Sequence, residues 1–117
     1  MKNPPQWPEH WYIDRRKITN YLLDLNHPVG GSKAKFFTSR GFRLDNPEAL
    51  ADALYTHRTI GGAAQTIVDE DGDIVMLFEG PIMAPDRSMP LVRSVWRQDP
   101  LGDAHFVTAY PIRKVKL

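Results

Sequence analysis

The chain has 117 residues, of which 42% are hydrophobic, and its 15 basic and 14 acidic residues give a formal net charge of +1. This length predicts one domain with a single modest core, and the near-neutral charge excludes a bulk nucleic-acid binder, so an RNA or DNA role needs a local basic cluster. The absence of cysteine excludes disulfides, thiolate zinc sites and a cysteine nucleophile. Without a long apolar run or a hydrophobic signal core, we expect a cytoplasmic protein with no membrane partner.

The first twelve residues are rich in proline, with Pro4, Pro5 and Pro8. We interpret residues 1–12 as an N-terminal arm, because closely spaced prolines interrupt regular structure. Two large aromatic residues of this arm, Trp7 and Trp11, are expected to pack back on the body of the protein. The remainder, residues 13–117, is predicted to form one α+β domain.

A first helix is predicted over residues 14–26. Asp14 is a suitable N-cap, and proline disfavours helical backbone at the residue before it, so His27-Pro28 ends the helix. The apolar positions that follow Asp14 recur at helical spacing. They are Ile18, Tyr21, Leu22 and Leu25.

Two further helices follow in the first half of the chain. Ser32 is the predicted cap of a short helix over residues 32–40, which Gly41 stops, since glycine is common just after a helix. An Asn-Pro pair then predicts the start of a third helix over residues 46–58, with proline at its first position.

The second half of the chain reads as four strands, at residues 63–69, 74–80, 90–98 and 105–112. The segment Asp69–Asp73 (DEDGD) between the first two contains an Asp-Gly turn signal. It resembles part of a calcium loop but lacks the later bidentate glutamate of an EF-hand, so a hairpin turn explains it better. Helices followed by strands predict an α+β fold with about three N-terminal helices packed on one face of a four-stranded antiparallel meander. The other face is then free to carry a site.

The segment HPVGGSKAKFF, residues 27–37, is the first candidate for chemistry. Main-chain N–H groups at a helix N-terminus, together with lysine side chains, suit a phosphate group. His27 can act as a general base near neutral pH. The spacing is not that of a P-loop, and a plain turn between helices remains an open interpretation. The predicted phosphate-binding residues are Gly30, Gly31, Ser32 and Lys35, with Lys33 beside them.

The last two strands carry further polar side chains. Phe106, Thr108 and Tyr110 are predicted to lie on one face of the last strand, because side chains alternate along a strand. Either Arg93 or Ser94 of the preceding strand shares that face. If paired residue numbers sum to an odd number, Arg93 does, and if they sum to an even number, Ser94 does. His57 lies on the apolar stripe of the third predicted helix, which favours a partly buried structural histidine over a catalytic one.

Three segments carry a family resemblance that spans about residues 17–111. They are KITNYLLDLNHPVGGSKAKFFTSRGF, MLFEGPIMAPDRSMPLVRSVW and HFVTAYP. In this order they resemble a family of small uncharacterised bacterial proteins with a helix, an HP-G-KA-FF segment, a V-EGP strand, an R-VW strand and a VTAYP ending.

A more distant likeness concerns architecture and one short motif. Helices followed by a meander that ends in T-x-Y-P are similar to the barnase-like, EndoU-like and RelE-like ribonuclease toxins. That likeness implies an RNase-toxin-like fold and RNA cleavage without metal or cofactor, in which the 2′-hydroxyl attacks its own phosphate and leaves a cyclic phosphate. It also implies a cognate antitoxin or another small protein as partner.

The residue types of this chain can serve that chemistry. His27 is the candidate general base, and Lys33 and Arg93 are candidates to stabilise charge on the phosphorane. Thr108 can donate a hydrogen bond to a phosphate oxygen, and Tyr110 can donate to the leaving oxygen or stack on a base. The alternative hypothesis is a non-catalytic protein-interaction module that docks through the N-terminal arm.

Overall fold

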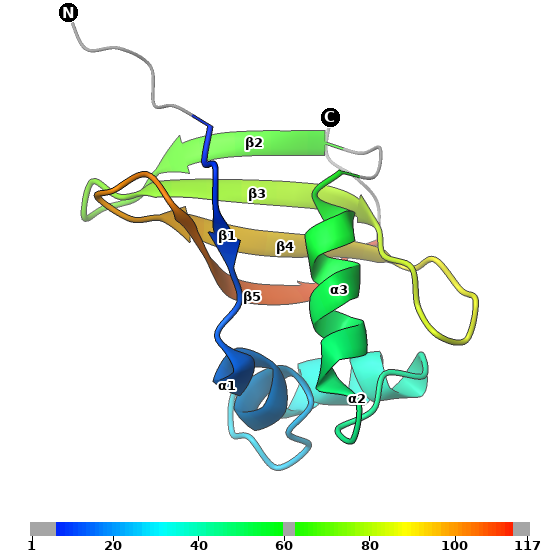
Figure 1. Cartoon of the computed structure of the whole chain (residues 1–117). Coiled ribbons are helices and arrows are strands. Elements are labelled where there is room, and N and C mark those ends of the chain that lie inside the picture. The colour runs from blue at the N-terminus through cyan, green and yellow to red at the C-terminus, as the bar shows by residue number, and fades with distance from the viewer. Residues whose placement is uncertain (1–6, 60–62, 114–117) are drawn as a thin grey trace, which may run out of the picture.

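The computed structural model describes residues 7–59 and 63–113 (Figure 1). Residues 1–6 of the predicted arm, and residues 114–117, lie outside the described part. No helix within that part combines the length and the apolar character needed to cross a bilayer. The elements in chain order are β1 (Trp11–Tyr12), α1 (Arg15–Lys17), the π-helical turn η1 (Ile18–Leu22), α2 (Gly31–Ser39), α3 (Pro47–His57), β2 (Ala63–Val68), β3 (Ile74–Pro81), β4 (Leu91–Gln98) and β5 (Ala104–Pro111).

The sheet has five strands in the order β1-β5-β4-β3-β2. Strands β2 to β5 pair with their chain neighbours in antiparallel fashion, but β1 pairs with β5 in parallel, with Trp11 opposite Ala104. The prediction of a four-stranded antiparallel meander was therefore wrong, because the described sheet is five-stranded and mixed. The additional strand comes from the predicted arm and has two residues, which is too short for a period-2 pattern to reveal.

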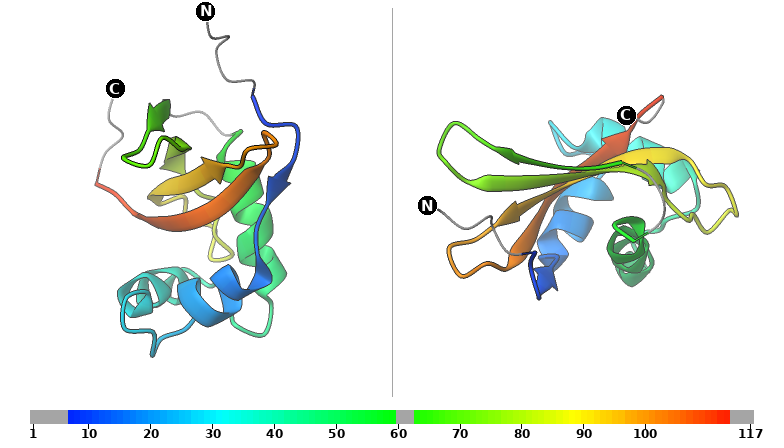
Figure 2. Two further views of the ribbon diagram at one scale, coloured as in Figure 1. Left: turned by 90° about the vertical axis from the view of Figure 1, so that its left-hand side faces the viewer. Right: turned by 90° about the horizontal axis from the view of Figure 1, so that it is seen from above.

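The described helices also differ from the predicted single layer. Helix α3 crosses one face of the sheet, whereas α1 and α2 lie beyond the β5 edge (Figure 1, Figure 2). Contacts between elements agree, since α3 contacts β3 while α1 and α2 contact β5. Strand β1 pairs only with the start of β5, at Ala104 and His105, so the rest of that edge is open to the helices.

The core lies between α3, η1, α2 and one face of the sheet. Trp96 of β4 is fully buried, and its ring packs edge-to-face against Trp11 and Phe106 at centroid distances of 5.3 Å each. Truncating such a residue to alanine typically costs about 3–5 kcal/mol, so Trp96 anchors the layers. The largest fully buried apolar residues are Trp96, Phe37, Phe42, Ile18, Leu22, Leu50, Leu54, Ile82 and Val92.

The first predicted helix is shorter than expected. Asp14 is its N-cap, as predicted, and accepts a hydrogen bond from the Arg16 N–H at 2.9 Å. The helical backbone widens at Ile18, whose carbonyl accepts from the Leu23 N–H, and it ends at Leu22 rather than at residue 26. Asp24 then bonds the N–H of the residue two positions on, a local turn that competes with the helix.

The second helix begins one residue earlier than predicted. Its N-cap is Gly30, so the prediction that Ser32 caps it was wrong. Its end agrees with the prediction, because Gly41 follows the C-cap with a φ of 98°, a backbone conformation that favours glycine. The third helix begins with proline in its first turn, as predicted, although Asn46 at its N-cap makes no side-chain capping bond.

The register between β4 and β5 decides which residues share the open sheet face. Arg93 lies opposite Tyr110, and Val95 lies opposite Thr108. Both pairs sum to 203, an odd number, so Arg93 shares the face of Thr108 and Tyr110. Ser94 points to the opposite face and is fully buried. A register shift after Val95 then changes the pairing toward the turn.

Candidate functional site

A row of cross-strand neighbours lies on the sheet face that α3 does not cover. Arg93 of β4 has Glu79 of β3 on one side and Tyr110 of β5 on the other. Its guanidinium donates from Nε and Nη2 to Oε1 of Glu79, at 3.1 and 2.5 Å, and from Nη1 to the Tyr110 hydroxyl at 3.0 Å. The bonds to Glu79 and then to Tyr110 raise the pKa of Arg93, so the row holds a permanent cation.

Glu79 is only 6% exposed, and Arg93 is half-buried above it. The guanidinium is therefore fixed in position rather than free to sample solvent. Three of its five N–H groups are used in these bonds, and within the described residues two remain to face a ligand.

A second cluster lies at the β5 edge, where the helices meet the sheet. Thr108 is two residues before Tyr110 on the same face of β5, about 7 Å along the strand. Its hydroxyl lies 2.8 Å from the hydroxyl of Tyr21 in η1, and Lys33 of α2 donates to the same Tyr21 oxygen at 2.8 Å. We call Lys17, Tyr21, Lys33 and Thr108 the Tyr21 cluster.

Positive charge surrounds the Tyr21 ring. The ammonium groups of Lys33 and Lys17 lie 5.2 and 5.7 Å from the ring centroid. Burial raises the pKa of Tyr21, but the hydrogen bonds from Lys33 and Thr108 and the charges of the two lysines outweigh burial and lower it below the ordinary phenol value. The phenolate form is therefore more accessible here than in an isolated tyrosine.

His27 lies beside the same ring, with its imidazole edge-to-face on Tyr21 at a centroid distance of 5.1 Å. Its Nδ1 accepts hydrogen bonds from the main-chain N–H groups of Val29 and Gly30, at 3.0 and 2.9 Å. Two donors aimed at Nδ1 keep that nitrogen unprotonated, so in the neutral ring the proton is on Nε2. In this geometry His27 closes the turn and offers an N–H donor, and it has no lone pair left to accept a proton.

The glycines of this turn are engaged by the protein itself. The Gly30 N–H donates to His27 Nδ1 and the Gly31 N–H donates to the His27 carbonyl. Gly30 also packs so closely on Tyr21 that an added Cβ would lie 2.6 Å from its ring. The predicted phosphate-binding role of these two N–H groups therefore competes with the turn, which leaves Ser32 at the exposed start of α2.

The two lysines of the segment have different surroundings. Lys33 faces the Tyr21 hydroxyl, whereas Lys35 is exposed. Lys35 follows Lys33 by two residues, which is a rotation of about 200° around the helix axis, so Lys35 lies on the opposite side of α2 from Lys33. Of the predicted set, the structure brings Lys33 and Thr108 to the same Tyr21 hydroxyl and gathers Arg93 and Tyr110 on the same face of the sheet. Lys35 lies apart from them.

Sequence reasoning missed two members of this surface, Tyr21 and Glu79. Tyr21 was assigned to the apolar stripe of its helix, where its ring does pack. The available signal was that Tyr21 is the one residue of the stripe with a polar tip, four residues after Lys17. Glu79 lies within an apolar strand, where an acidic residue needs a partner, and Arg93 supplies it.

His57 of α3 is buried with 2% exposure, which is more complete than the partial burial predicted from its place on the apolar stripe. Its Nε2 donates to the carbonyls of Gly80 and Val92, at 3.1 and 3.0 Å, and its Nδ1 accepts from the Ser94 hydroxyl at 2.9 Å. Burial lowers the pKa of His57, and the two carbonyls offset this only in part. His57 is therefore a neutral structural link between α3 and the sheet.

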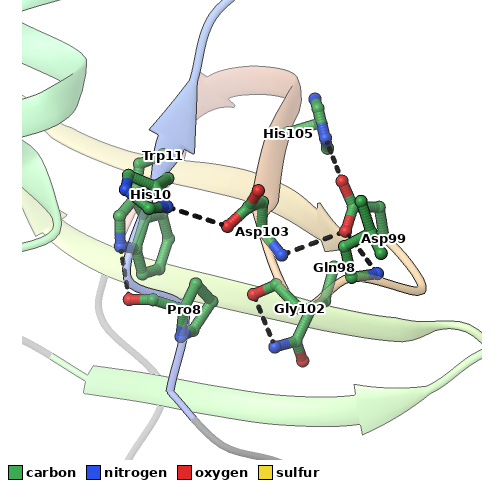
Figure 3. Close-up of polar contacts among 9 residues, drawn as sticks. Pro8, His10, Trp11, Gln98, Asp99, Gly102, Asp103 and His105 are labelled. Carbon is green, nitrogen blue, oxygen red and sulfur yellow. Dashed lines mark hydrogen bonds and ion pairs between the residues drawn. The ribbon is translucent and has the colours of Figure 1, made fainter.

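The opposite end of the sheet carries acidic turns. His10 Nδ1 lies 3.2 Å from Asp103 and His105 Nε2 lies 2.7 Å from Asp99, so both histidines pair with the β4–β5 turn (Figure 3). The turn DEDGD is a hairpin, as predicted, in which Asp69 accepts from the N–H groups of Asp71 and Asp73. Arg97 pairs with the same turn. These carboxylates therefore serve turn geometry and ion pairs.

Comparisons with known proteins place the chain in a family. Residues 5–113 match the model of the family described as Domain of unknown function (DUF6883), and the chain belongs to that family. No curated protein sequence matches the chain.

A solved structure shares the fold. It is a chain from a contact-dependent growth inhibition toxin–immunity protein complex of Klebsiella pneumoniae 342, with a TM-score of 0.66 and 14% identity. The match covers 86% of this chain and 98% of that chain, so the whole domain corresponds.

Proposed function

We propose that this protein is a metal-independent endoribonuclease that acts as a bacterial toxin. The observation that carries the proposal is the gathering of Lys33, Thr108, Arg93 and Tyr110 along one strand, β5, and its immediate neighbours. Two cations and two hydroxyl groups on one surface match the needs of a phosphodiester that gains negative charge during cleavage.

The substrate class follows from the groups present. Lys33 and Arg93 supply positive charge for the non-bridging phosphate oxygens, and Thr108 contributes a hydroxyl group that is hydrogen-bonded to Tyr21. The oxygen of Tyr110 accepts a hydrogen bond from Arg93. In this proposal, Tyr110 donates its proton to the leaving oxygen or stacks on a base. His27 offers its Nε2–H to the substrate and fixes the turn. The RNA 2′-hydroxyl is the nucleophile and a cyclic phosphate is the product.

A small protein partner is part of the proposal. The fold is similar to a chain of a toxin–immunity protein complex, and a cationic surface of this kind suits an acidic inhibitor that occupies it. Overall charge does not oppose such a partner, since the net charge is only +1. In this proposal the partner blocks the Tyr21 cluster and the Arg93 row until it is removed.

The test is cleavage of RNA by the purified protein, with end-group analysis for the cyclic phosphate. Lys33→Met and Thr108→Val are expected to lower cleavage at least 100-fold, and Lys35→Met is the matched control on the opposite side of α2. EDTA is expected to leave the rate unchanged. Equal cleavage by Lys33→Met and Lys35→Met, with both proteins folded, contradicts the site. No cleavage of any RNA by the wild type contradicts the function.

A second candidate function is a non-catalytic interaction module. The observation that favours it is the aromatic surface near β1, where Trp7 is 58% exposed although it packs on Trp11 and Phe78. Large exposed aromatic side chains are typical of binding surfaces. Trp7→Ser separates the two functions, because it is expected to weaken partner binding under this hypothesis and to leave RNA cleavage unchanged under the first.

A further inference from the structure

Three structural elements surround the side chain of Tyr21. Lys33 of α2 donates to it at 2.8 Å, Thr108 of β5 lies 2.8 Å from it, and Lys17 of α1 lies near its ring. The remaining side of the ring packs on His27. Tyr21 itself is half-buried, and its oxygen is held by the contacts with Lys33 and Thr108.

We infer that Tyr21 is the general base of the ribonuclease proposed above, with Lys33 and Thr108 as the groups that position and stabilise its phenolate. The inference rests on that proposed function and names the proton acceptor that the function requires. In the phenolate form, both Lys33 and Thr108 donate to the oxygen, and one lone pair remains for a substrate hydroxyl.

The reaction step balances without any further reagent. The phenolate oxygen of Tyr21 takes the proton of the RNA 2′-hydroxyl, and the bond from O2′ to phosphorus forms. The bond from phosphorus to O5′ breaks, and the leaving oxygen takes the proton of the Tyr110 hydroxyl. Tyr21 ends as a phenol and Tyr110 as a phenolate next to Arg93, and exchange of one proton with water restores both.

The geometry favours Tyr21 over the other candidate bases. His27 Nδ1 already accepts two main-chain N–H groups, so it has no free lone pair. Glu79 is 6% exposed and accepts two N–H bonds from Arg93, which holds its carboxylate within the ion pair. Tyr21 is half-buried, and the charges around it support its ionisation, because they lower the pKa of the phenol.

The position of the ring is also fixed in advance. Gly30 lies directly against Tyr21, and a Cβ at Gly30 would approach the ring to 2.6 Å and the Tyr21 carbonyl to 2.8 Å. The side chain therefore cannot swing toward the turn. A base that is held in place loses little entropy when the substrate arrives, which is the condition for effective proton transfer.

The pH dependence follows from the same contacts. The groups that face the Tyr21 oxygen or ring are Lys33, Lys17, Thr108 and His27. The rate of cleavage should rise with pH until the phenol is ionised. Loss of the Lys33 charge removes a cause that lowers the phenol pKa, so the rising limb should move to higher pH in Lys33→Gln.

The experiment compares Tyr21→Phe with Tyr12→Phe, a matched removal of a hydroxyl from an exposed tyrosine. Cleavage of a fixed RNA oligonucleotide is followed as a function of pH, and NMR titration of ring-labelled tyrosine follows the phenol directly. We expect Tyr21→Phe to lose at least 100-fold in kcat and to lose the rising pH limb, while Tyr12→Phe keeps both. The NMR titration should give a Tyr21 pKa below the ordinary phenol value, and this pKa should move upward in Lys33→Gln.

The outcomes separate the two proposals. An active wild type with an equally active Tyr21→Phe overturns the base and leaves the ribonuclease standing. An active wild type in which Glu79→Gln alone removes the rising limb assigns the base to Glu79 and also overturns the inference. A wild type that cleaves no RNA overturns the function and the base together. A Tyr21 phenol that titrates at or above the ordinary phenol value overturns the inference even when cleavage is observed.

Discussion

Replacing His57 by leucine tests whether the buried histidine is a structural link. The change removes the Nε2–H that the carbonyls of Gly80 and Val92 share, and the acceptor for the Ser94 hydroxyl. Leaving a buried polar group without its partner costs about 1–3 kcal/mol. One shared donor and one acceptor are lost, so we expect a decrease of about 3 kcal/mol in the free energy of unfolding, which is a large part of a typical total of about 5–15 kcal/mol.

The assay is urea unfolding followed by tryptophan fluorescence, because the Trp96 indole donates to Ser94 in the same network. With a slope of about 1.5 kcal/mol per molar urea, the midpoint should fall by about 2 M. His105→Leu is the control, since its side chain is 51% exposed and pairs only at the surface with Asp99. A midpoint for His57→Leu within about 0.3 M of the control would refute the structural role.

Comparison of the wild type with His57→Leu also tests the pH dependence of stability. Burial lowers the pKa of His57 in the folded state, whereas the unfolded chain takes up a proton near the ordinary value of about 6.5. Below that pH the unfolded state binds more protons, so stability is full above about pH 6.5 and falls as the pH decreases. We expect this component to disappear in His57→Leu. An identical acid slope in the wild type and the variant would show that His57 is not its source.

Two further substitutions test the turn and the short strand. Gly30→Ala forces a Cβ to within 2.8 Å of the Tyr21 carbonyl, so we expect the free energy of unfolding, measured by thermal unfolding, to fall by about 1–3 kcal/mol. The NMR signal of the Tyr21 ring should shift as well. An unchanged ring signal would contradict the packing argument. Trp11→Ala removes a half-buried ring that packs on Trp96 and lies 4.5 Å from the Arg58 guanidinium. Calorimetry should therefore show a decrease of about 2 kcal/mol in the free energy of unfolding. A decrease below about 0.5 kcal/mol would mean that β1 is only loosely attached.

The sequence predicts most element positions because local signals dominate them. The cap at Asp14, the glycine after α2 and the Asp-Gly turn before β3 all agree with the structure. The fifth strand was missed for a physical reason. Its partner lies more than 90 positions along the chain, and Trp11 joins the sheet because its ring packs on Trp96, a tertiary effect that a two-residue pattern cannot show.

The candidate site could be predicted only in part. Arg93, Thr108 and Tyr110 were identified by residue type, but their common face depends on a register that the sequence left open. The core decides that register: Ser94 must face inward to meet His57, and Arg93 then faces outward beside Tyr110. Tyr21 was missed because it was assigned a packing role on the apolar stripe of its helix. Its ring does pack there, but its hydroxyl belongs to the candidate site.

The segment HPVGGSKAKFF shows how a turn and a reactive group depend on each other. His27 closes the turn through Nδ1, which places Gly30 against Tyr21 and starts α2 at Gly31, two residues before Lys33, which donates to the phenol. A side chain at Gly30 would displace the Tyr21 ring. A shift of the helix by one residue would rotate Lys33 by about 100° around the helix axis, away from the phenol. Lys35 lies on the far side of the same helix and therefore serves as the control for Lys33 within one segment. The chemistry we propose therefore depends on the phase of α2, which the turn sets.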